Sequence, residues 1–163
     1  MKRRYILFYG IAAIFFALWA DQFSKYMLTA NLAAGEHVAF GDYFDLVRVW
    51  NTGVSFSMFN NHGEVGRIVL CGLSLAVCAF LLYWMFKEKN IYKIISLGLI
   101  VGGAVGNVID RVRFGAVLDF LDFHIAGYHW PAFNLADSFI CIGAFVLIVM
   151  EFYHKQKNEE EKK

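Results

Sequence analysis

Charge is scarce in this sequence. Of its 163 residues, 18% are Asp, Glu, Lys or Arg, one is proline and three are cysteine, whereas 59% are hydrophobic. A soluble globular domain is about half apolar and about a quarter charged. The composition therefore excludes an ordinary soluble domain, and we expect a membrane protein with no nucleic-acid partner.

The cysteines and histidines form no recognisable metal motif. Cysteine in an apolar segment packs as a small hydrophobic residue, and all three lie in such segments: Cys71, Cys78 and Cys141. His124 and His129, with Asp119 or Asp122, are an alternative metal site, but their spacing matches neither a helical i, i+4 pair nor a zincin motif. We expect no metal and no cofactor.

Four long apolar segments dominate the chain. A membrane-spanning helix needs about 20 predominantly apolar residues, and segments of this kind lie near 5–29, 66–86, 91–110 and 135–153. We predict a membrane α-helical fold with one domain over 1–154, outer loops at 31–65 and 111–134, and a disordered cytoplasmic tail at 155–163. The basic start also resembles a secretory signal peptide, but the apolar run is long and lacks a good cleavage site, so an uncleaved first helix is expected.

The distribution of lysine and arginine predicts the orientation. If the N-terminus is cytoplasmic, ten basic residues fall on the cytoplasmic side and five on the outer side. Because cytoplasmic segments carry the excess of basic residues, we expect both termini in the cytoplasm. The unusual polar residues described below then lie at the outer face.

The two outer loops are predicted to form a small β-sheet. Residues 37–50 are rich in β-branched and aromatic residues, and the turn-forming Asn51-Thr52-Gly53 follows them. We expect two or three short strands in this loop, the last at Val54–Phe59, and a strand or hairpin after Phe114. Since Trp and Tyr favour the membrane interface, these strands and loops are expected to form a cradle on the outer membrane surface.

The third apolar segment carries glycines at four-residue spacing, Gly98, Gly102 and Gly106. Such a repeat forms a groove that lets another helix approach closely. We expect Gly98 and Gly102 to serve helix packing, and Gly106 also to make room beside Asn107.

Polar side chains gather at the outer ends of the apolar segments. Asn107 and Arg111 are four residues apart and share a helix face, and Asn134 and Asp137 are three apart where the last segment begins. Asp119 lies in the loop between them. Ionisable residues at membrane depth indicate a functional site, and paired carboxylates such as Asp119 and Asp137 perform general acid and base chemistry on water.

Each of these residues also has a structural interpretation. Asp137, in a first helical turn, is stabilised by the helix dipole, and Asn134 is a suitable N-cap. Structural ion pairs are the alternative for the remaining charges: Asp110 with Arg111, and Asp21 with Lys25. The residue patterns alone leave both interpretations open.

Five motifs occur in order along the chain. They are Asp21-Gln-Phe-Ser-Lys25, Asn51-Thr-Gly-Val-Ser-Phe56, Gly103-Ala-Val-Gly-Asn107-Val-Ile-Asp110-Arg111, Val117-Leu-Asp119-Phe120 and Phe133-Asn134-Leu-Ala-Asp137-Ser138. In this set and order the chain resembles the bacterial lipoprotein signal peptidases (signal peptidase II) over nearly its whole length, apart from the tail.

The resemblance implies an aspartic endopeptidase, a multi-pass protein of the bacterial cytoplasmic (inner) membrane with its active site at the periplasmic face. Such enzymes cut prolipoproteins just before a cysteine that carries a diacylglyceryl group. The matching positions imply Asp119 and Asp137 as the catalytic pair, and supporting or substrate-binding roles for Asn107, Arg111, Asn134, Asp21, Lys25, Asn51, Gly53 and Asp110. We expect contact with membrane lipid and a monomer. Asp137 is expected to be the ionised acid at rest, because a helix N-terminus favours its charged form.

Two other classes of function are considered. A small ion or solute transporter would use the outer carboxylates to carry ions, and it predicts polar residues near the middle of the bilayer and broken helices. A structural or assembly factor would need none of these residues to be ionisable. The polar groups at one edge of uninterrupted apolar segments favour the enzyme.

Overall fold

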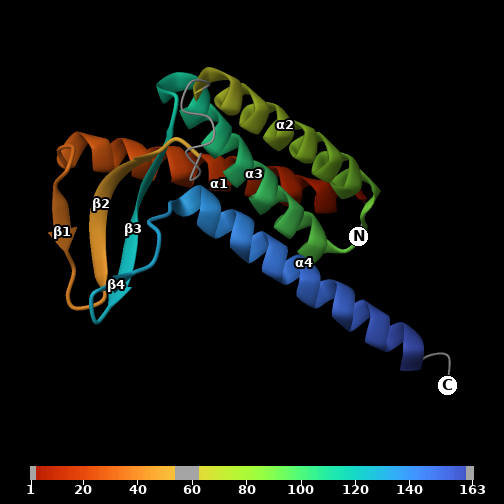
Figure 1. Cartoon of the computed structure of the whole chain (residues 1–163). Helices are drawn as coiled ribbons and strands as arrows, with labels where there is room; N and C mark the ends of the chain where they lie inside the picture. Colours follow the sequence, from red (N-terminus) through yellow and green to blue (C-terminus); the bar gives the residue numbers. More distant parts are fainter. Residues whose placement is uncertain (1–2, 54–62, 161–163) are drawn as a thin grey trace.

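The computed structural model describes residues 3–53 and 63–160 of the chain. The helices in this part are α1 (Arg3–Asn31), α2 (Gly63–Lys87), α3 (Ile91–Phe114) and α4 (Leu135–Glu160), and the strands are β1 (His37–Ala39), β2 (Phe44–Asn51), β3 (Val117–Ile125) and β4 (Tyr128–His129). Each of the four helices contains a segment long and apolar enough to cross a membrane. The predicted four-span architecture is confirmed, and the sheet lies at one end of the helices (Figure 1).

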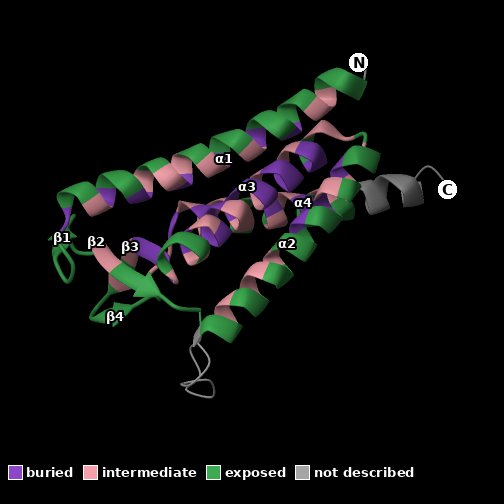
Figure 2. Cartoon of the chain, turned by 90° about the horizontal axis from the view of Figure 1, so that it is seen from above, coloured by how far each residue is buried: buried purple, intermediate pink, exposed green. Residues whose placement is uncertain are grey.

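α3 lies at the centre of the bundle and packs against the other three helices. In its most apolar segment 67% of the residues are buried, against 22% or less in each of the other spans, and Figure 2 shows this difference in colour. Met85, Ile94 and Leu97 are among the side chains fully buried where α2 and α3 meet. The outward faces of α1, α2 and α4 carry exposed aromatic and aliphatic side chains, as expected of surfaces in contact with lipid.

The glycine repeat of α3 packs against α1, as its spacing predicts. A methyl group at Gly102 would lie 2.5 Å from the carbonyl oxygen of Ile14 and 2.8 Å from Cβ of Ala17. Gly98 stands equally close to the backbone of Gly10. Because the nearest atoms opposite are backbone carbonyl oxygens, a side chain at these positions forces the two helices apart.

Gly102→Ala is therefore expected to destabilise the folded protein, by about 1–3 kcal/mol as is typical of overpacking. The matched control is Gly72→Ala in α2, where no atom of the described residues lies within 4 Å of the added methyl group. That change is expected to be neutral or stabilising, since Ala is about 1 kcal/mol better than Gly inside a helix. Thermal unfolding in detergent measures both, and equal melting temperatures for the two variants would contradict the packing role.

The sheet is antiparallel, in the order β1-β2-β3-β4. Residues 37–50 form two strands and the second loop forms the β3–β4 hairpin, as predicted, whereas the third strand expected at Val54–Phe59 lies outside the described residues. β2 and β3 pair from Phe44 opposite Phe123 to Asn51 opposite Val117, and a bulge interrupts the pairing between Leu46 and Val49. A bulge redirects the side chains of the strand that contains it, and Arg48 lies within this one.

β3 separates two environments. Successive side chains of a strand point to opposite faces. Leu118 and Phe120 therefore pack on one face against Leu28 and Leu32, at the end of α1, while Asp119 between them points to the other face. This alternation places one carboxylate beside α4, and it places the apolar side chains of Leu118 and Phe120 on the face toward α1.

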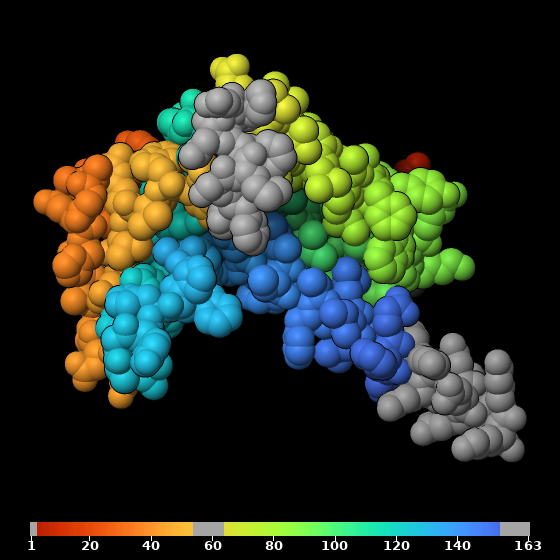
Figure 3. Space-filling view, viewed as in Figure 1, coloured from red at the N-terminus to blue at the C-terminus, as the bar shows by residue number. Residues whose placement is uncertain are grey.

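α4 is longer than its apolar segment. The sequence predicted a disordered tail from residue 155, but the helix continues to Glu160. Lys, Gln and Glu are strong helix formers, so the change from apolar to charged residues does not by itself end a helix. The space-filling view shows α4 extending below the rest of the bundle (Figure 3). Its side chains Phe145 and Phe152 are exposed.

Candidate functional site

Asn134 links the two aspartates that were predicted to act as a pair. Asp119 on β3 is 2% exposed, and Asp137 lies in the first turn of α4. The side-chain amide of Asn134 donates to Asp119 Oδ1 at 2.7 Å, and its oxygen accepts from the backbone N–H of Asp137 at 3.0 Å. The backbone N–H of Asn134 in turn donates to Asp137 Oδ2 at 3.4 Å. Asn134 is thus the N-cap of α4 and also holds the second carboxylate beside it.

Two further asparagines donate to the outer oxygens of the pair. Asn107 Nδ2 lies 2.8 Å from Asp137 Oδ1, and Asn51 Nδ2 lies 2.9 Å from Asp119 Oδ2. Asn51 is itself oriented by a turn, because its Oδ1 accepts from the backbone N–H of Gly53 at 2.8 Å. Gly53 has a φ of 77°, which side-chain-bearing residues rarely adopt. The Asn51-Thr52-Gly53 turn therefore aims one amide at Asp119.

A buried ion cluster lies directly behind the acid pair. Lys25 Nζ lies 2.9 Å from Asp21 Oδ2 and 2.6 Å from Asp110 Oδ2, and it donates to Asn107 Oδ1 at 3.2 Å. Asp21 is fully buried and Asp110 is 2% exposed. Since Asn107 contacts both Lys25 and Asp137, this one side chain joins the ion cluster to the acid pair.

The structural alternative considered for Asp110, an ion pair with Arg111, is wrong because Asp110 has another partner. Neighbours on a helix point in different directions, so Asp110 reaches across to Lys25 on α1 instead of pairing with Arg111. Arg111 donates to the backbone oxygen of Asn107 at 3.4 Å. Its Nε is buried and has no hydrogen-bond partner among the described residues, and its guanidinium lies next to Gly53.

Gln22 is a site residue that the sequence analysis missed. Its amide nitrogen lies 2.9 Å from Asp110 Oδ1, 3.1 Å from Asp21 Oδ2 and 3.3 Å from the carbonyl oxygen of Gly106. The sequence feature that could have indicated Gln22 is its place directly after Asp21, which makes it a second polar residue at membrane depth. Gly106 makes room beside Asn107, as predicted, and the side chain that occupies this space is Asp21, whose Oδ2 would lie 2.5 Å from an added methyl group.

α4 is also fastened to α1 through its backbone. The N–H of Ala136, in the first turn of α4, donates to Asp21 Oδ1 at 3.0 Å. The first N–H groups of a helix have no partner within that helix, so a buried carboxylate satisfies one of them. All ten predicted site residues therefore lie in one connected region at the sheet end of the bundle.

Burial raises the pKa of Asp119 above its usual 3.8, and the charge of nearby Asp137 acts in the same direction. The hydrogen bonds from Asn51 and Asn134 favour the ionised form and offset only part of this effect. Asp119 therefore keeps its proton to a higher pH than an ordinary aspartate.

This shift predicts a pH-dependent difference between the wild type and Asp119→Asn. Above 3.8 the unfolded chain releases this proton while the folded protein retains it, so the wild type loses stability as the pH rises to the raised pKa of Asp119. The melting temperature of Asp119→Asn should rise relative to that of the wild type across this window. Asp42→Asn, which changes an exposed carboxylate, serves as the control and should follow the wild type; a constant difference for Asp119→Asn would contradict the shift.

The histidines pair with separate carboxylates. His129 Nδ1 lies 2.8 Å from Asp122 Oδ2, and His124 Nε2 lies 3.4 Å from Asp45 Oδ1. In the described part of the chain, no three His, Cys, Asp or Glu side chains are arranged to hold a metal ion. Asp119 faces the asparagines and not this pair of histidines.

The sequence is similar to a known protein family and to individual members of it. The sequence model of the family described as "Signal peptidase (SPase) II" matches residues 13–153. A lipoprotein signal peptidase of Anaplasma phagocytophilum is 42% identical over 142 residues, which cover 87% of this chain and 90% of the relative. One of Oleidesulfovibrio alaskensis is 42% identical over 159 residues, which cover 95% of this chain and all of the relative.

The fold is also similar to that of solved structures. A chain described as a bacterial membrane enzyme, determined by the in meso method at 2.3 Å resolution, aligns with a TM-score of 0.78 and 27% sequence identity. The alignment covers 94% of this chain and 91% of that one. The bundle and the sheet are therefore shared over nearly the full length of both proteins.

Proposed function

Because the chain belongs to the signal peptidase II family, we propose that it removes the signal peptide from diacylglyceryl-modified prolipoproteins. The peptide bond cut is the one just before the modified cysteine. The observation that carries the proposed mechanism is the pair of carboxylates, Asp119 and Asp137, held by one asparagine at the end of an apolar helical bundle. We further propose that the protein acts as a monomer in the bacterial inner membrane, with both termini cytoplasmic and the acid pair at the periplasmic face.

Asp137 is the proposed general base. It accepts hydrogen bonds from Asn107 and from the backbone of Asn134, and it lies at a helix N-terminus; both features stabilise a negative charge. Its carboxylate takes a proton from water while the water oxygen attacks the scissile carbonyl carbon. Its partial exposure leaves room for that water beside it.

Asp119 is the proposed general acid. Its raised pKa keeps a proton available for the carbonyl oxygen as the carbonyl carbon becomes tetrahedral. When the C–N bond breaks, the proton held by Asp137 passes to the departing amine. Asp119 recovers a proton from a hydroxyl group of the tetrahedral intermediate. The proton balance closes within the pair and the water, so the mechanism requires no metal or cofactor.

The ion cluster has a positioning role in this proposal. Lys25 Nζ donates a hydrogen bond to Asn107 Oδ1, and this leaves the amide nitrogen of Asn107 directed toward Asp137. Asp21 holds the first turn of α4, and with it Asp137, through the N–H of Ala136. A substrate that is itself a membrane helix with an attached lipid can reach the outer ends of the spans sideways from the bilayer.

The test is cleavage of a purified precursor lipoprotein by the purified protein in detergent. One precursor carries the diacylglyceryl group on its cysteine and the other does not. We expect cleavage of the lipidated precursor only, with mass spectrometry showing the lipidated cysteine as the new N-terminal residue. If the folded protein leaves that precursor intact, the proposed function is wrong, and ion transport becomes the next assay.

A further inference from the structure

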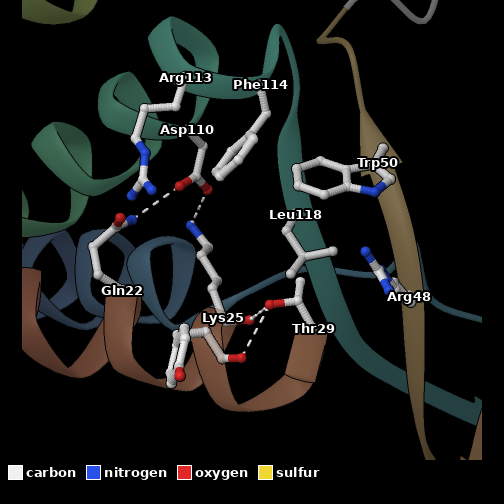
Figure 4. Close-up of a pocket in the computed structure, with 10 residues that line it drawn as sticks. Gln22, Lys25, Thr29, Arg48, Trp50, Asp110, Arg113, Phe114 and Leu118 are labelled. Atoms are coloured by element: carbon white, nitrogen blue, oxygen red, sulfur yellow. Dashed lines mark hydrogen bonds and ion pairs between the residues drawn. The ribbon is translucent and has the colours of Figure 1, made fainter. Parts of the chain in front are cut away.

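A polar cavity lies on the other face of β3 from Asp119. It has a volume of about 190 Å³ and lies between α1, the end of α3 and β2. Leu118 lines it, and the rings of Trp50 and Phe114, whose centroids are 5.3 Å apart and whose planes are tilted by 54°, form one wall (Figure 4). Because Leu118 and Asp119 point to opposite faces of one strand, this cavity is separate from the acid pair.

The cavity has an excess of positive charge. Its charged lining residues are Lys25, Arg48, Arg113 and Asp110, and the first and last of these form an ion pair with each other. The two arginines remain, one from the bulge of β2 and one from the end of α3 (Figure 4). Neither has a carboxylate partner among the described residues, so the cavity offers two guanidinium groups to an anion.

The hydrogen bonds of the arginines are incomplete. Arg48 donates from Nη1 to the carbonyl oxygen of Leu32 at 2.9 Å, but its Nε is buried without a hydrogen-bond partner among the described residues. The guanidinium of Arg113 lies 4.9 Å from the ring centroid of Phe114 and has no other interaction within residues 3–53 and 63–160. Arginine matches phosphate oxygens with its planar set of donors.

An apolar groove continues from this cavity along α1. The groove has a volume of about 410 Å³ and shares Gln22 and Tyr26 with the polar cavity. It extends to Phe15 and is lined by Trp19 and Phe23, whose rings stack 5.2 Å apart. From Tyr26 to Phe15 a helix advances about 16 Å, roughly half the thickness of the hydrocarbon layer.

We propose that the cavity and groove together bind an anionic phospholipid of the surrounding leaflet. The phosphate lies between Arg48 and Arg113, and one acyl chain follows α1 toward Phe15. The diacylglyceryl group of a prolipoprotein has no phosphate to meet the arginines, and a free phosphate does not use the groove. A zwitterionic headgroup also fits less well, because Asp110 is already paired with Lys25 and leaves no carboxylate for an ammonium group.

Native mass spectrometry of the delipidated full-length protein in detergent tests this site. The probes are dioleoyl phosphatidylglycerol, dioleoyl phosphatidylethanolamine, dioleoyl glycerol and glycerol phosphate. We expect phosphatidylglycerol to bind most tightly, and Arg48→Gln/Arg113→Gln to weaken it at least tenfold. The control Arg4→Gln/Lys89→Gln, which removes two exposed charges distant from the sheet, should leave its binding unchanged.

The single variant Arg113→Gln is included because this side chain is exposed, so its replacement is not expected to misfold the protein. It should weaken phosphatidylglycerol binding about threefold or more. Equal binding of dioleoyl glycerol and phosphatidylglycerol, or binding that survives removal of both arginines, would overturn the proposal. Glycerol phosphate binding as tightly as the lipid would likewise overturn it, since the ligand would then be a soluble phosphate.

Discussion

Asp119→Asn and Asp137→Asn are each expected to slow cleavage of a lipidated prolipoprotein by about 10³-fold or more, since each removes a general acid or base. Residues that act as a unit have non-additive effects. The double variant should therefore be about as slow as either single one. Single-turnover cleavage in detergent, measured at saturating enzyme, gives the comparison.

The control for these variants is Asp42→Asn, which removes an exposed carboxylate in the loop between β1 and β2 and should cleave at the wild-type rate. Folding is checked by thermal unfolding, because an asparagine at position 119 cannot accept from both Asn51 and Asn134 as the carboxylate does. Near wild-type cleavage by a folded Asp119→Asn or Asp137→Asn protein would remove that residue from the mechanism.

The second large effect is expected for Lys25→Met. This change removes the cation between Asp21 and Asp110, both of which are almost completely buried. Breaking a buried ion pair from one side costs about 3–5 kcal/mol, because the remaining charge is left uncompensated. The melting temperature in detergent should fall accordingly, and cleavage should fall with it because Asn107 loses its partner.

Lys93→Met is the matched control. Lys93 also forms an ion pair from a buried position, but its partner Glu151 is 56% exposed and remains solvated when the lysine is lost, so a smaller loss is expected. The double variant Lys25→Met/Asp110→Asn should be less destabilised than the sum of its two single changes, because both remove the same interaction. Additive losses would show that Lys25 and Asp110 are not coupled.

The coupling between these parts explains why the site contains so many amides. Asn107, Asn134 and Asn51 each donate to a carboxylate of the acid pair and accept from another group. A side-chain amide is both donor and acceptor. Each of these residues is therefore held by one group, such as Lys25 or a capping backbone N–H, and in turn holds a carboxylate of the acid pair in a fixed orientation. Replacement of any one by an apolar residue leaves a buried polar atom unpaired.

The sequence alone determined the helical architecture and the contacts between neighbours within one helix. Runs of about 20 apolar residues must cross a membrane as helices, because the backbone has no other way to satisfy its hydrogen bonds there. The spacing within a helix also decided local pairs, such as Lys25 with Asp21 four residues earlier and the cap formed by Asn134 and Asp137. These relations depend only on the helical period.

The tertiary structure decided which distant residues meet. Asp110 pairs with Lys25 and not with the adjacent Arg111, Gln22 joins the ion cluster, and Gly106 accommodates Asp21, because α1 packs closely against α3. Arg48 lies two residues before Trp50 on β2, and the pairing of Trp50 with Leu118 places both side chains at a cavity on the far side of the sheet from Asp119. Such contacts follow from the depth and rotation of packed helices and from strand register, which no periodicity within a single segment contains.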